Sequence, residues 1–366
     1  MADTTWVLAD HTGKAQTPIE NASERRFTAH RNAGKQGRIT LGHDDREARK
    51  LFELLRNGVP QLRYYRGMRD GSKPLRLSAY LTSIREELDE DGESKLVATF
   101  KDPFARIYGD GSGQEPGRIL LAPADFVGVD QGTIAWSLID VLNQVGTAGD
   151  TGLRQGTIEA TTARDRSYVT GKNVGEAIEQ LTQVVGGFDF EVLPLDPTTA
   201  DGKLGEFAVY ASQGSDRADL IWGYGKGTFA NVRKAERNIT PPINRVHMVT
   251  SDGLESIQDD GLSRGRQGEW AVSLSAPNDV VQQATLDGQA EDALRPDWVR
   301  VTTFRPDPNI GPQPFDDFWL GDTGRFKARE GAFEESFVPR VNGIVITENE
   351  GGDEDYELET EEVLDG

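Results

Sequence analysis

The sequence predicts an α+β, β-rich fold with two β-barrel domains, a mixed α/β lobe and an insertion. Three observations lead to this fold class. Short segments in which apolar and polar residues alternate recur along the chain, as half-buried strands require. The 41 glycines mark turns between many of these segments. Few segments show the three- and four-residue apolar spacing of an amphipathic helix. At 366 residues the chain exceeds what one hydrophobic core usually serves, so several lobes are expected.

Residues 1–108 predict the first β-barrel domain, with one helix packed on it. Strands are expected near residues 5–8 and 38–41. The helix should begin at a cap formed by Asp44 or Asp45 and end at Gly58, because apolar residues between them recur at helical spacing. Two long alternating strands follow, with turns at 70–71 and 91–92.

Residues 109–204 predict the mixed α/β lobe. Gly and Pro in GDGSGQEPGR mark its start. GTIAWSLIDVLNQVG and NVGEAIEQLTQVVGG both carry apolar residues at helical spacing, and both end at Gly as a helix C-terminus often does. FDFEVLP then alternates as a strand.

Strand patterns return in residues 205–245 and 297–358, which predict the second β-barrel domain. The polar stretch between them, 246–296, predicts an inserted lobe. Residues 359–366 are expected to form an acidic C-terminal tail, since the chain from Glu348 onward has ten acidic residues and no basic one.

Composition excludes several classes of function. Cysteine is absent, which removes disulfides, thiolate nucleophiles and cysteine-ligated metals. The net charge of −21 argues against nucleic-acid affinity, which depends on Lys and Arg, but suits a surface along which DNA passes without binding.

No apolar run is long enough to span a bilayer, so we expect no membrane insertion. The N-terminus does not resemble a secretory signal, and we expect synthesis in the host cytoplasm.

Catalytic and ligand-binding patterns are sparse. The four histidines never fall at the close spacing that zinc sites use. Gly223, Gly225 and Gly227 surround Lys226, but the spacing matches neither a P-loop nor a dinucleotide-binding fingerprint. No G-x-S-x-G motif is present. We therefore predict that the chain is not an enzyme and has no catalytic residues, metal site or cofactor.

One acidic and aromatic stretch, DDFWLGDTGRF from Asp316 to Phe326, raises the alternative of a metal or sugar site. Turn chemistry alone accounts for its Gly and Asp, which favours a turn over a ligand site. In this interpretation Trp319 and Leu320 end one strand, and Phe326 with Ala328 begins the next. The prediction is a structural turn of the second barrel at Leu320, Gly321 and Asp322.

The order of these parts resembles the baseplate hub proteins of tailed bacteriophages, and in particular minor tail proteins of long-tailed phages (siphoviruses) that infect actinobacteria. Four stretches carry the resemblance: ITLGHDDREARKLFELLRNGVPQLRYYRG, NVGEAIEQLTQVVGGFDFEVLP, YGKGTFANVRKAERNITPPINRVHMVTSDG, and DDFWLGDTGRFKAREG with RVNGIVITENEGGDEDYELE. It covers nearly the whole chain, although each motif is loose.

The resemblance implies a gp27-like hub fold and a structural role in the virion. Three copies would form a ring at the tail tip whose six similar barrels match the sixfold tail. The implied partners are two further copies, the distal tail protein, the tape measure protein and other tail-tip proteins, with DNA passing through the ring. The alternatives are a distal tail protein in a hexameric ring, and a tail adhesin that binds cell-surface glycan through Trp222 or Trp270. A peptidoglycan hydrolase is a third alternative.

Overall fold

The computed structural model describes residues 3–14, 16–43, 45–88, 94–109, 117–144, 150–184, 186–225, 230–250, 252–276, 283–330 and 333–364. Several predicted features lie outside these residues: Asp44 as a helix cap, the turn at residues 91–92, most of the boundary segment GDGSGQEPGR, the helix end at Gly146, and Lys226 and Gly227 of the glycine-rich segment.

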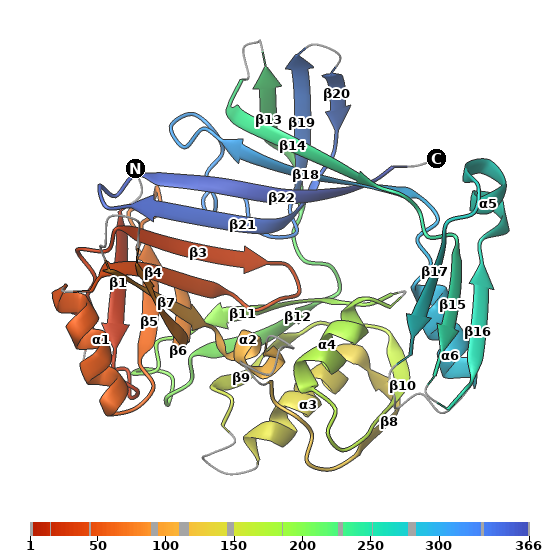
Figure 1. Cartoon of the computed structure of the whole chain (residues 1–366), viewed down its shortest axis with the longest axis horizontal. Coiled ribbons are helices and arrows are strands. Elements are labelled where there is room, and N and C mark those ends of the chain that lie inside the picture. Colours follow the sequence, from red (N-terminus) through yellow and green to blue (C-terminus); the bar gives the residue numbers. More distant parts are fainter. Residues whose placement is uncertain are drawn as a thin grey trace.

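The first β unit is a curved antiparallel sheet with one helix packed on it (Figure 1). Its strand order is β2-β1-β5-β6-β7-β4-β3. Within the described residues no hydrogen-bonded ladder joins β3 back to β1, so the sheet is open. Its elements are β1 (Thr4–Ala9), β2 (Gln16–Pro18), β3 (Glu24–His30), β4 (Gln36–Gly42), α1 (Arg46–Arg56), β5 (Gln61–Arg66), β6 (Leu75–Leu88) and β7 (Ser94–Lys101).

The second β unit is a closed barrel with an additional strand. Six strands follow one another in the order β13-β14-β18-β22-β21-β19, and β19 pairs again with β13. Strand β20 extends this unit from β19. Its elements are β13 (Asp216–Gly225), β14 (Val232–Thr240), β18 (Trp298–Pro306), β19 (Thr323–Glu330), β20 (Phe333–Phe337), β21 (Arg340–Asn349) and β22 (Glu354–Leu364).

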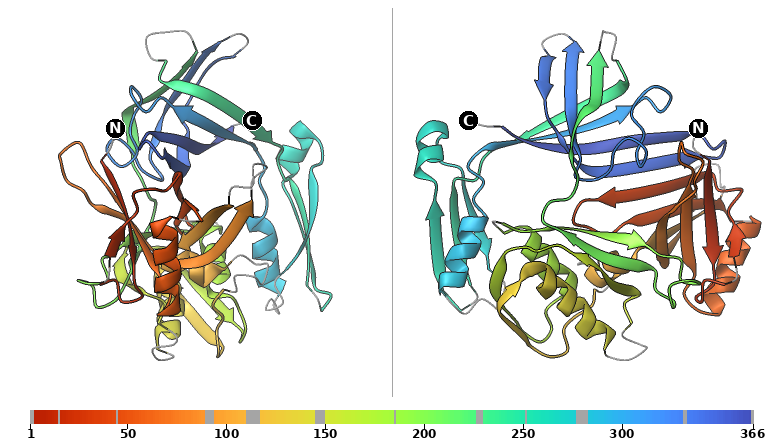
Figure 2. Two further views of the ribbon diagram at one scale, coloured as in Figure 1. Left: turned by 60° about the vertical axis from the view of Figure 1, so that its left-hand side comes forward. Right: turned by 180° about the vertical axis from the view of Figure 1, so that it is seen from behind.

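Two further parts lie beside the β units. The mixed lobe contains α2 (Pro103–Tyr108), β8 (Ala124–Asp130), α3 (Gln131–Asn143), β9 (Leu153–Ile158), β10 (Ala163–Tyr168), α4 (Val174–Thr182), β11 (Asp189–Pro194) and β12 (Gly205–Tyr210). The inserted lobe contains β15 (Arg245–Val249), β16 (Glu255–Asp259), α5 (Gly261–Gln267), β17 (Ala271–Ser275) and α6 (Gln283–Asp292). The inserted lobe lies at the end of the molecule opposite α1 (Figure 2).

Among the described residues, buried apolar side chains form three separate clusters. The largest contains residues of both β units, from Trp6 and Phe27 to Trp222 and Phe326, so the two units share one core. A second cluster lies between the helices and strands of the mixed lobe. A third, of five buried residues around Leu286, lies inside the inserted lobe.

The two β units share one strand topology. The order β5-β6-β7-β4-β3 recurs in the second unit as β19-(β20 and β21)-β22-β18-β14, with antiparallel pairing at every step. The long strand β6 corresponds to β20 and β21, which are separated at Val338 and Pro339. The sixth strand differs, because β1 is antiparallel to β5 whereas β13 is parallel to β19.

A shared β-bulge fixes the residue correspondence. The β6–β7 ladder shifts register between Leu81, opposite Phe100, and Ser83, opposite Thr99. The β21–β22 ladder shifts between Val341, opposite Thr360, and Gly343, opposite Glu359. All four residues of the second ladder lie 260 positions after their counterparts, since 343 − 83 and 359 − 99 both equal 260. Bulges are specific local features, so the agreement shows a repeated unit.

A ladder between β3 and β21 joins the units into one 14-stranded sheet. The pairing runs from Glu24 opposite Asn349 to His30 opposite Gly343. Arg25 and Glu348 face each other within it, and their side chains form a buried ion pair of 2.9 Å. The first unit therefore contacts the second through its terminal strand.

The predicted helices after Asp45, after Gln131 and near Val174 are present as α1, α3 and α4. Three expected boundaries differ from the structure. Residues 205–210 form β12, which pairs with β11 and β9 of the mixed lobe and not with the second barrel. Residues 359–364, expected as part of a tail, continue β22 between β18 and β21, where Arg300 donates to Glu362 at 2.7 Å and Asn342 to Glu361 at 2.6 Å. Among the described residues of 3–108, seven strands form the first unit's sheet with α1 and α2, and no ladder between them closes that sheet into a barrel.

Candidate functional site

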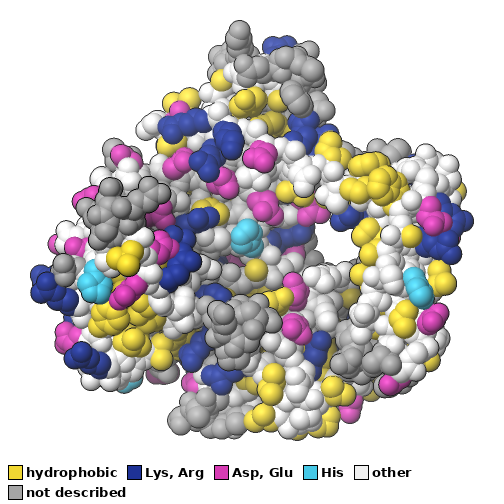
Figure 3. Space-filling view, in the orientation of Figure 1, with side chains coloured by type: hydrophobic (Ala, Val, Ile, Leu, Met, Phe, Trp, Pro, Cys, Tyr) yellow, Lys and Arg dark blue, Asp and Glu magenta, His cyan; other side chains and the backbone are white. Residues whose placement is uncertain are grey.

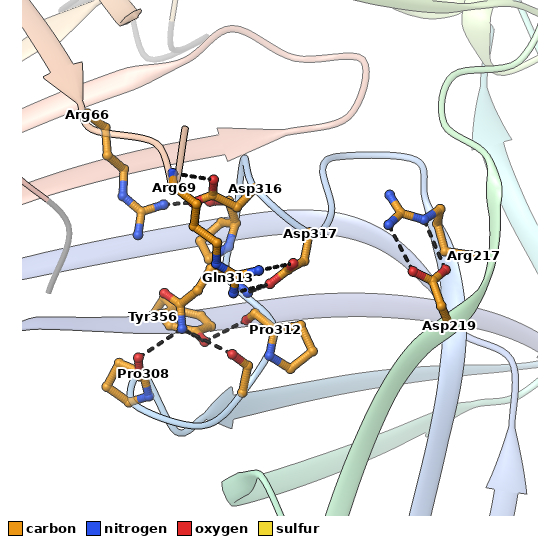
Figure 4. Close-up of polar contacts among 12 residues, drawn as sticks. Arg66, Arg69, Arg217, Asp219, Pro308, Pro312, Gln313, Asp316, Asp317 and Tyr356 are labelled. Atoms are coloured by element: carbon orange, nitrogen blue, oxygen red, sulfur yellow. Dashed lines mark hydrogen bonds and ion pairs between the residues drawn. The ribbon is translucent and has the colours of Figure 1, made fainter. Parts of the chain in front are cut away.

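The segment between β18 and β19, residues 307–322, lies where the two β units and the mixed lobe meet. Figure 4 shows part of this junction. The amide of Gln313 donates to the carbonyl oxygens of Pro308 (2.8 Å) and Gly311 (3.1 Å), which fold the segment into a compact loop. The Tyr356 hydroxyl donates to the carbonyl of Pro312 at 2.7 Å, attaching the loop to β22.

The carboxylates of the acidic and aromatic stretch are bound by groups of the chain itself. The Arg69 guanidinium donates to both oxygens of Asp317, at 2.6 and 2.8 Å, and the Arg69 backbone N–H donates to Asp316 at 3.0 Å. Asp322 accepts from the backbone N–H groups of Ser215 and Trp319, each at 2.8 Å. These carboxylates hold the first unit and the chain entering β13 against the loop.

The predicted turn residues, Leu320, Gly321 and Asp322, immediately precede β19. The Asp322 N–H donates to the Trp319 carbonyl at 3.2 Å, and Gly321 has φ of 86°, a conformation that glycine adopts without strain. Leu320 is buried in the shared core. Trp319 and Leu320 do not end a strand, because the preceding residues form the loop just described.

Aromatic stacking fixes the same loop from the core side. The rings of Phe315 and Trp319 stack at 4.3 Å between centroids, and the Arg76 guanidinium lies 4.3 Å from the Phe315 ring centre. Phe315 has φ of 72°, which is uncommon for a side chain of this size. Contacts on both faces of the ring and the peptide hydrogen bond from Phe315 N–H to Phe318 O hold this conformation in place.

Glu191 of β11 connects all three parts. Its carboxylate accepts from Lys35 Nζ of the first unit at 2.6 Å and from Trp319 Nε1 of the second at 2.9 Å. Gln213, in the connection to β13, donates to its other oxygen at 3.0 Å. Lys35 and Glu191 are both buried, so removing either side chain would leave the other charge buried without a counter-charge.

Asp189, two residues earlier on the same strand, repeats this connection. It accepts from Asn32 Nδ2 at 2.8 Å and from Arg340 Nη2 at 2.7 Å. Burial opposes its ionisation, but the Gln213 N–H and the nearby Arg31 outweigh that effect and hold the pKa of Asp189 below its usual value. The carboxylate is therefore ionised at neutral pH and joins the mixed lobe to both β units.

A second buried pair joins β5 to β22. Arg66 donates to Glu354 at 2.7 Å and to the Pro314 carbonyl at 2.6 Å. Burial raises the pKa of Glu354, and the adjacent Arg66 opposes the rise. Like the pairs at Glu191 and Glu348, this one links segments far apart in the sequence.

A cleft of about 820 Å³ lies beside this pair. Its walls are the β5–β6 turn, the loop before β19 and the start of β22. Four basic and four acidic side chains line it, and its cations are paired: Lys73 with Asp3, Arg69 with Asp317, and Arg233 with Asp307. The mixed, paired lining gives the cleft no preference for one sign of charge.

The remaining sequence candidates are dispersed. Trp222 is fully buried in the shared core, which excludes it from stacking on a glycan, whereas Trp270 is 40% exposed and packs edge-on against Trp298. Gly223 and Gly225 lie on β13. Across the described ranges, no three His, Cys, Asp or Glu side chains are placed to hold a metal ion. Within the same ranges, no helix is long and apolar enough to cross a membrane.

Asp189 and Glu191 were not among the residues predicted from the sequence. Both lie on one face of FDFEVLP, and alternating carboxylates normally indicate a solvated strand face. Here the opposite face packs in the mixed-lobe core, while the two carboxylates point at the β units. Their partners can be identified only from the structure, because Asn32 and Lys35 lie more than 150 positions away in the sequence.

No protein-family model and no curated protein matches this sequence. Solved structures match it along nearly its whole length. The tail protein from Neisseria meningitidis MC58 is 12% identical, with a TM-score of 0.56, over 98% of this chain and 96% of that one. The 43 kDa tail protein of prophage MuSo2 from Shewanella oneidensis is 10% identical, with a TM-score of 0.52, over 97% of each chain. A chain of the lidded Francisella PdpA–VgrG complex is 10% identical, with a TM-score of 0.52, over 99% of this chain and 53% of that one.

The chain thus has the fold of phage tail proteins. The predicted α+β, β-rich fold class is confirmed. At these identities the likeness concerns the fold alone.

Proposed function

We propose that this protein is a structural component of a phage virion, the hub of the tail tip. In this proposal three copies form a ring that joins the tail tube to the tip and lets DNA pass. The observation that carries it is the repeated β unit, with its shared bulge, in a chain that has the fold of phage tail proteins. A trimer of chains with two similar units each contains six such units, which matches the symmetry of a sixfold tube.

The internal junction supports this role. Buried ion pairs at Glu191, Glu348 and Glu354 and one shared core hold the units in a fixed relation, as a ring subunit requires. We also propose a functional division into two hub units, with the mixed lobe and the inserted lobe projecting from the ring. The space-filling view shows a gap between the inserted lobe and the rest of the molecule, as a projecting part would have (Figure 3). The chain's net charge of −21 suits a bore that repels DNA. A strongly positive bore in a solved ring would contradict this part.

The partners in this proposal are two further copies, the distal tail protein, the tape measure protein and other tail-tip proteins. No catalytic role is proposed for any residue. Actinobacteriophages of the long-tailed type remain the proposed source, on the resemblance of the four sequence stretches alone.

The test is the copy number per ring. Light scattering gives the mass of the purified protein, and cryo-electron microscopy of the particle gives its copies and position. Three copies at the tip support the hub. Six copies would indicate a distal tail protein instead. A monomer with no place in a particle would favour the adhesin, whose remaining candidate, Trp270, is then tested by cell-wall pull-down of Trp270→Ala.

A further inference from the structure

The repeated topology leaves two strand edges open at equivalent positions. Inside the chain, β3 of the first unit pairs with β21 of the second. The counterpart of β21 in the first unit is the distal half of β6, and the counterpart of β3 in the second unit is β14. In the ladders of the described residues, the distal half of β6 has no strand in the place that β3 takes beside β21. Strand β14 likewise has no strand in the place that β21 takes beside β3.

The open edge of β6 covers residues 82–88, since the Leu81 N–H still donates to the Pro60 carbonyl at 2.9 Å. Strand β5 pairs with β6 only as far as Tyr80, whereas β7 pairs with it as far as Leu88. In the ladders of the described residues, this half of β6 thus has β7 alone as a neighbour. Leu88, at the end of this edge, is 78% exposed. Natural proteins seldom leave a large apolar side chain exposed beside an unpaired strand edge, because such an edge can pair with another chain.

The open edge of β14 is similar. Strand β18 pairs with β14 from Val232 to Thr240, but β13 meets it only at Val232. Ile239, near the far end of this edge, is 45% exposed. In the ladders of the described residues, β14 is therefore paired with β18 along its length, and its other edge has a strand neighbour, β13, at Val232.

We propose that β14 of one copy pairs antiparallel with β6 of the next copy, as β3 pairs with β21 inside the chain. This inference rests on the proposed ring and names the contact that closes it. One chain carries both edges at different places, so the contact is heterologous and repeats from copy to copy until the ring closes.

The internal ladder also fixes the register. Following the ladders through β4 and β18 aligns Glu24 with Lys234 and His30 with Thr240. Transferring the β3–β21 register then places Thr240 opposite Ser83 and Asn238 opposite Arg85 of the next copy. The same register brings the residues of the inner face together as Ile239 with Ile84, Arg237 with Glu86, and Ala235 with Leu88.

These inner pairs are chemically matched. Ile239 and Leu88 would each lose exposed apolar surface against an apolar residue, and Arg237 would face the exposed carboxylate of Glu86. One outward pair, Glu236 with Glu87, has like charges. Each of these carboxylates already contacts a cation on its own strand, Lys234 and Arg85 respectively, and both lie in solvent.

Cysteine cross-linking tests the register, because the chain has no cysteine of its own. Directly opposed residues of antiparallel strands have Cα atoms about 4.5–5.5 Å apart, within the range of a disulfide. Under mild oxidation the double variant Ser83→Cys/Thr240→Cys should form covalent multimers in non-reducing electrophoresis, with a trimer as the largest product. The matched control, Ser83→Cys/Glu236→Cys, moves one thiol four residues along the same strand face, about 13 Å away, and should remain uncross-linked. Both variants keep Arg85 and Lys234, the cations that contact Glu87 and Glu236.

Charge exchange gives a second readout. Glu86→Arg alone should lower the assembled fraction at least tenfold in light scattering, and Glu86→Arg/Arg237→Glu should restore it, with circular dichroism verifying that each variant is folded. The inference is overturned if the register pair cross-links no more than its control. A trimer without these cross-links overturns the inference and leaves the hub function standing, whereas six copies per particle overturn the proposed function even where the cross-links form.

Discussion

Gly214 and Gly321 approach each other so closely that neither can carry a side chain. A Cβ on Gly214 would lie 2.1 Å from the carbonyl carbon of Gly321, and a Cβ on Gly321 would lie 2.3 Å from the carbonyl oxygen of Gln213. Both glycines have φ of 86°. The chain that leaves the mixed lobe here crosses directly over the turn that begins β19. This contact is the reason that the turn predicted from Gly-Asp chemistry needs glycine.

Gly321→Ala should therefore destabilise the protein strongly. The left-handed conformation alone costs a non-glycine residue about 1–2 kcal/mol, and the clash with backbone atoms adds to it. Urea unfolding measures the change. Gly71→Ala is the matched control, since Gly71 has φ of 82° but nothing within 4 Å of its missing Cβ. Equal losses in the two variants would show that the crossing tolerates a side chain.

Glu191→Gln should lower the free energy of unfolding by about 3 kcal/mol, because it leaves the buried Lys35 without its counter-charge. The double variant Lys35→Met/Glu191→Gln should lose less than the sum of the single variants, as expected for coupled residues. Glu206→Gln removes a partly exposed pair with Arg154 and should cost less than about 1 kcal/mol. A loss at residue 191 no larger than at residue 206 would contradict the junction's role.

Asp102 should make stability depend on pH. Burial raises its pKa to about 6, opposed by hydrogen bonds from the N–H groups of Ala105 and Lys35. Since the unfolded value is about 3.9, the folded state binds the proton more tightly. This contribution is fully present below pH 4 and is lost as pH rises through 6, which amounts to about 3 kcal/mol.

Unfolding curves between pH 4 and 7.5 for the wild type and for Asp102→Asn check this. The wild type minus variant difference should fall by about that amount as pH rises. Asp102→Ala should show the same pH dependence with a different offset. A difference that stays constant with pH in both variants would exclude a raised pKa at this position.

The sequence was sufficient for the fold class because the strand alternation and the helical spacing of α1, α3 and α4 are local patterns. It could not show that Glu191 is a junction residue, since its partners Lys35 and Trp319 lie 156 and 128 positions away. The prediction of an acidic tail differs from the structure for a related reason. The acidic residues of β22 alternate with Tyr356 and Leu358 as in a half-buried strand, but so many charges in one short segment are also typical of a solvated tail.

The inserted lobe should be removable without unfolding the second β unit. The hairpin β3–β4 turns within residues 31–35, whereas its counterpart β14–β18 holds the whole lobe between Thr240 and Val299. These two residues lie directly opposite each other in the ladder, so a four-residue turn can join them. The lobe has its own core around Leu286, and joining Thr240 to Val299 removes both Trp270 and Trp298, whose rings pack on each other. The deletion therefore leaves neither half of that contact on the barrel.

We expect the shortened chain to fold, with a free energy of unfolding reduced by no more than about 1–2 kcal/mol. Circular dichroism and urea unfolding measure this, and a comparison variant, Trp270→Ala in the full chain, gives the cost of breaking the tryptophan contact while the lobe is kept. A shortened chain that is insoluble or unfolded would show that the lobe supports the barrel, which would place a folding role in a part of the chain whose counterpart is a short turn.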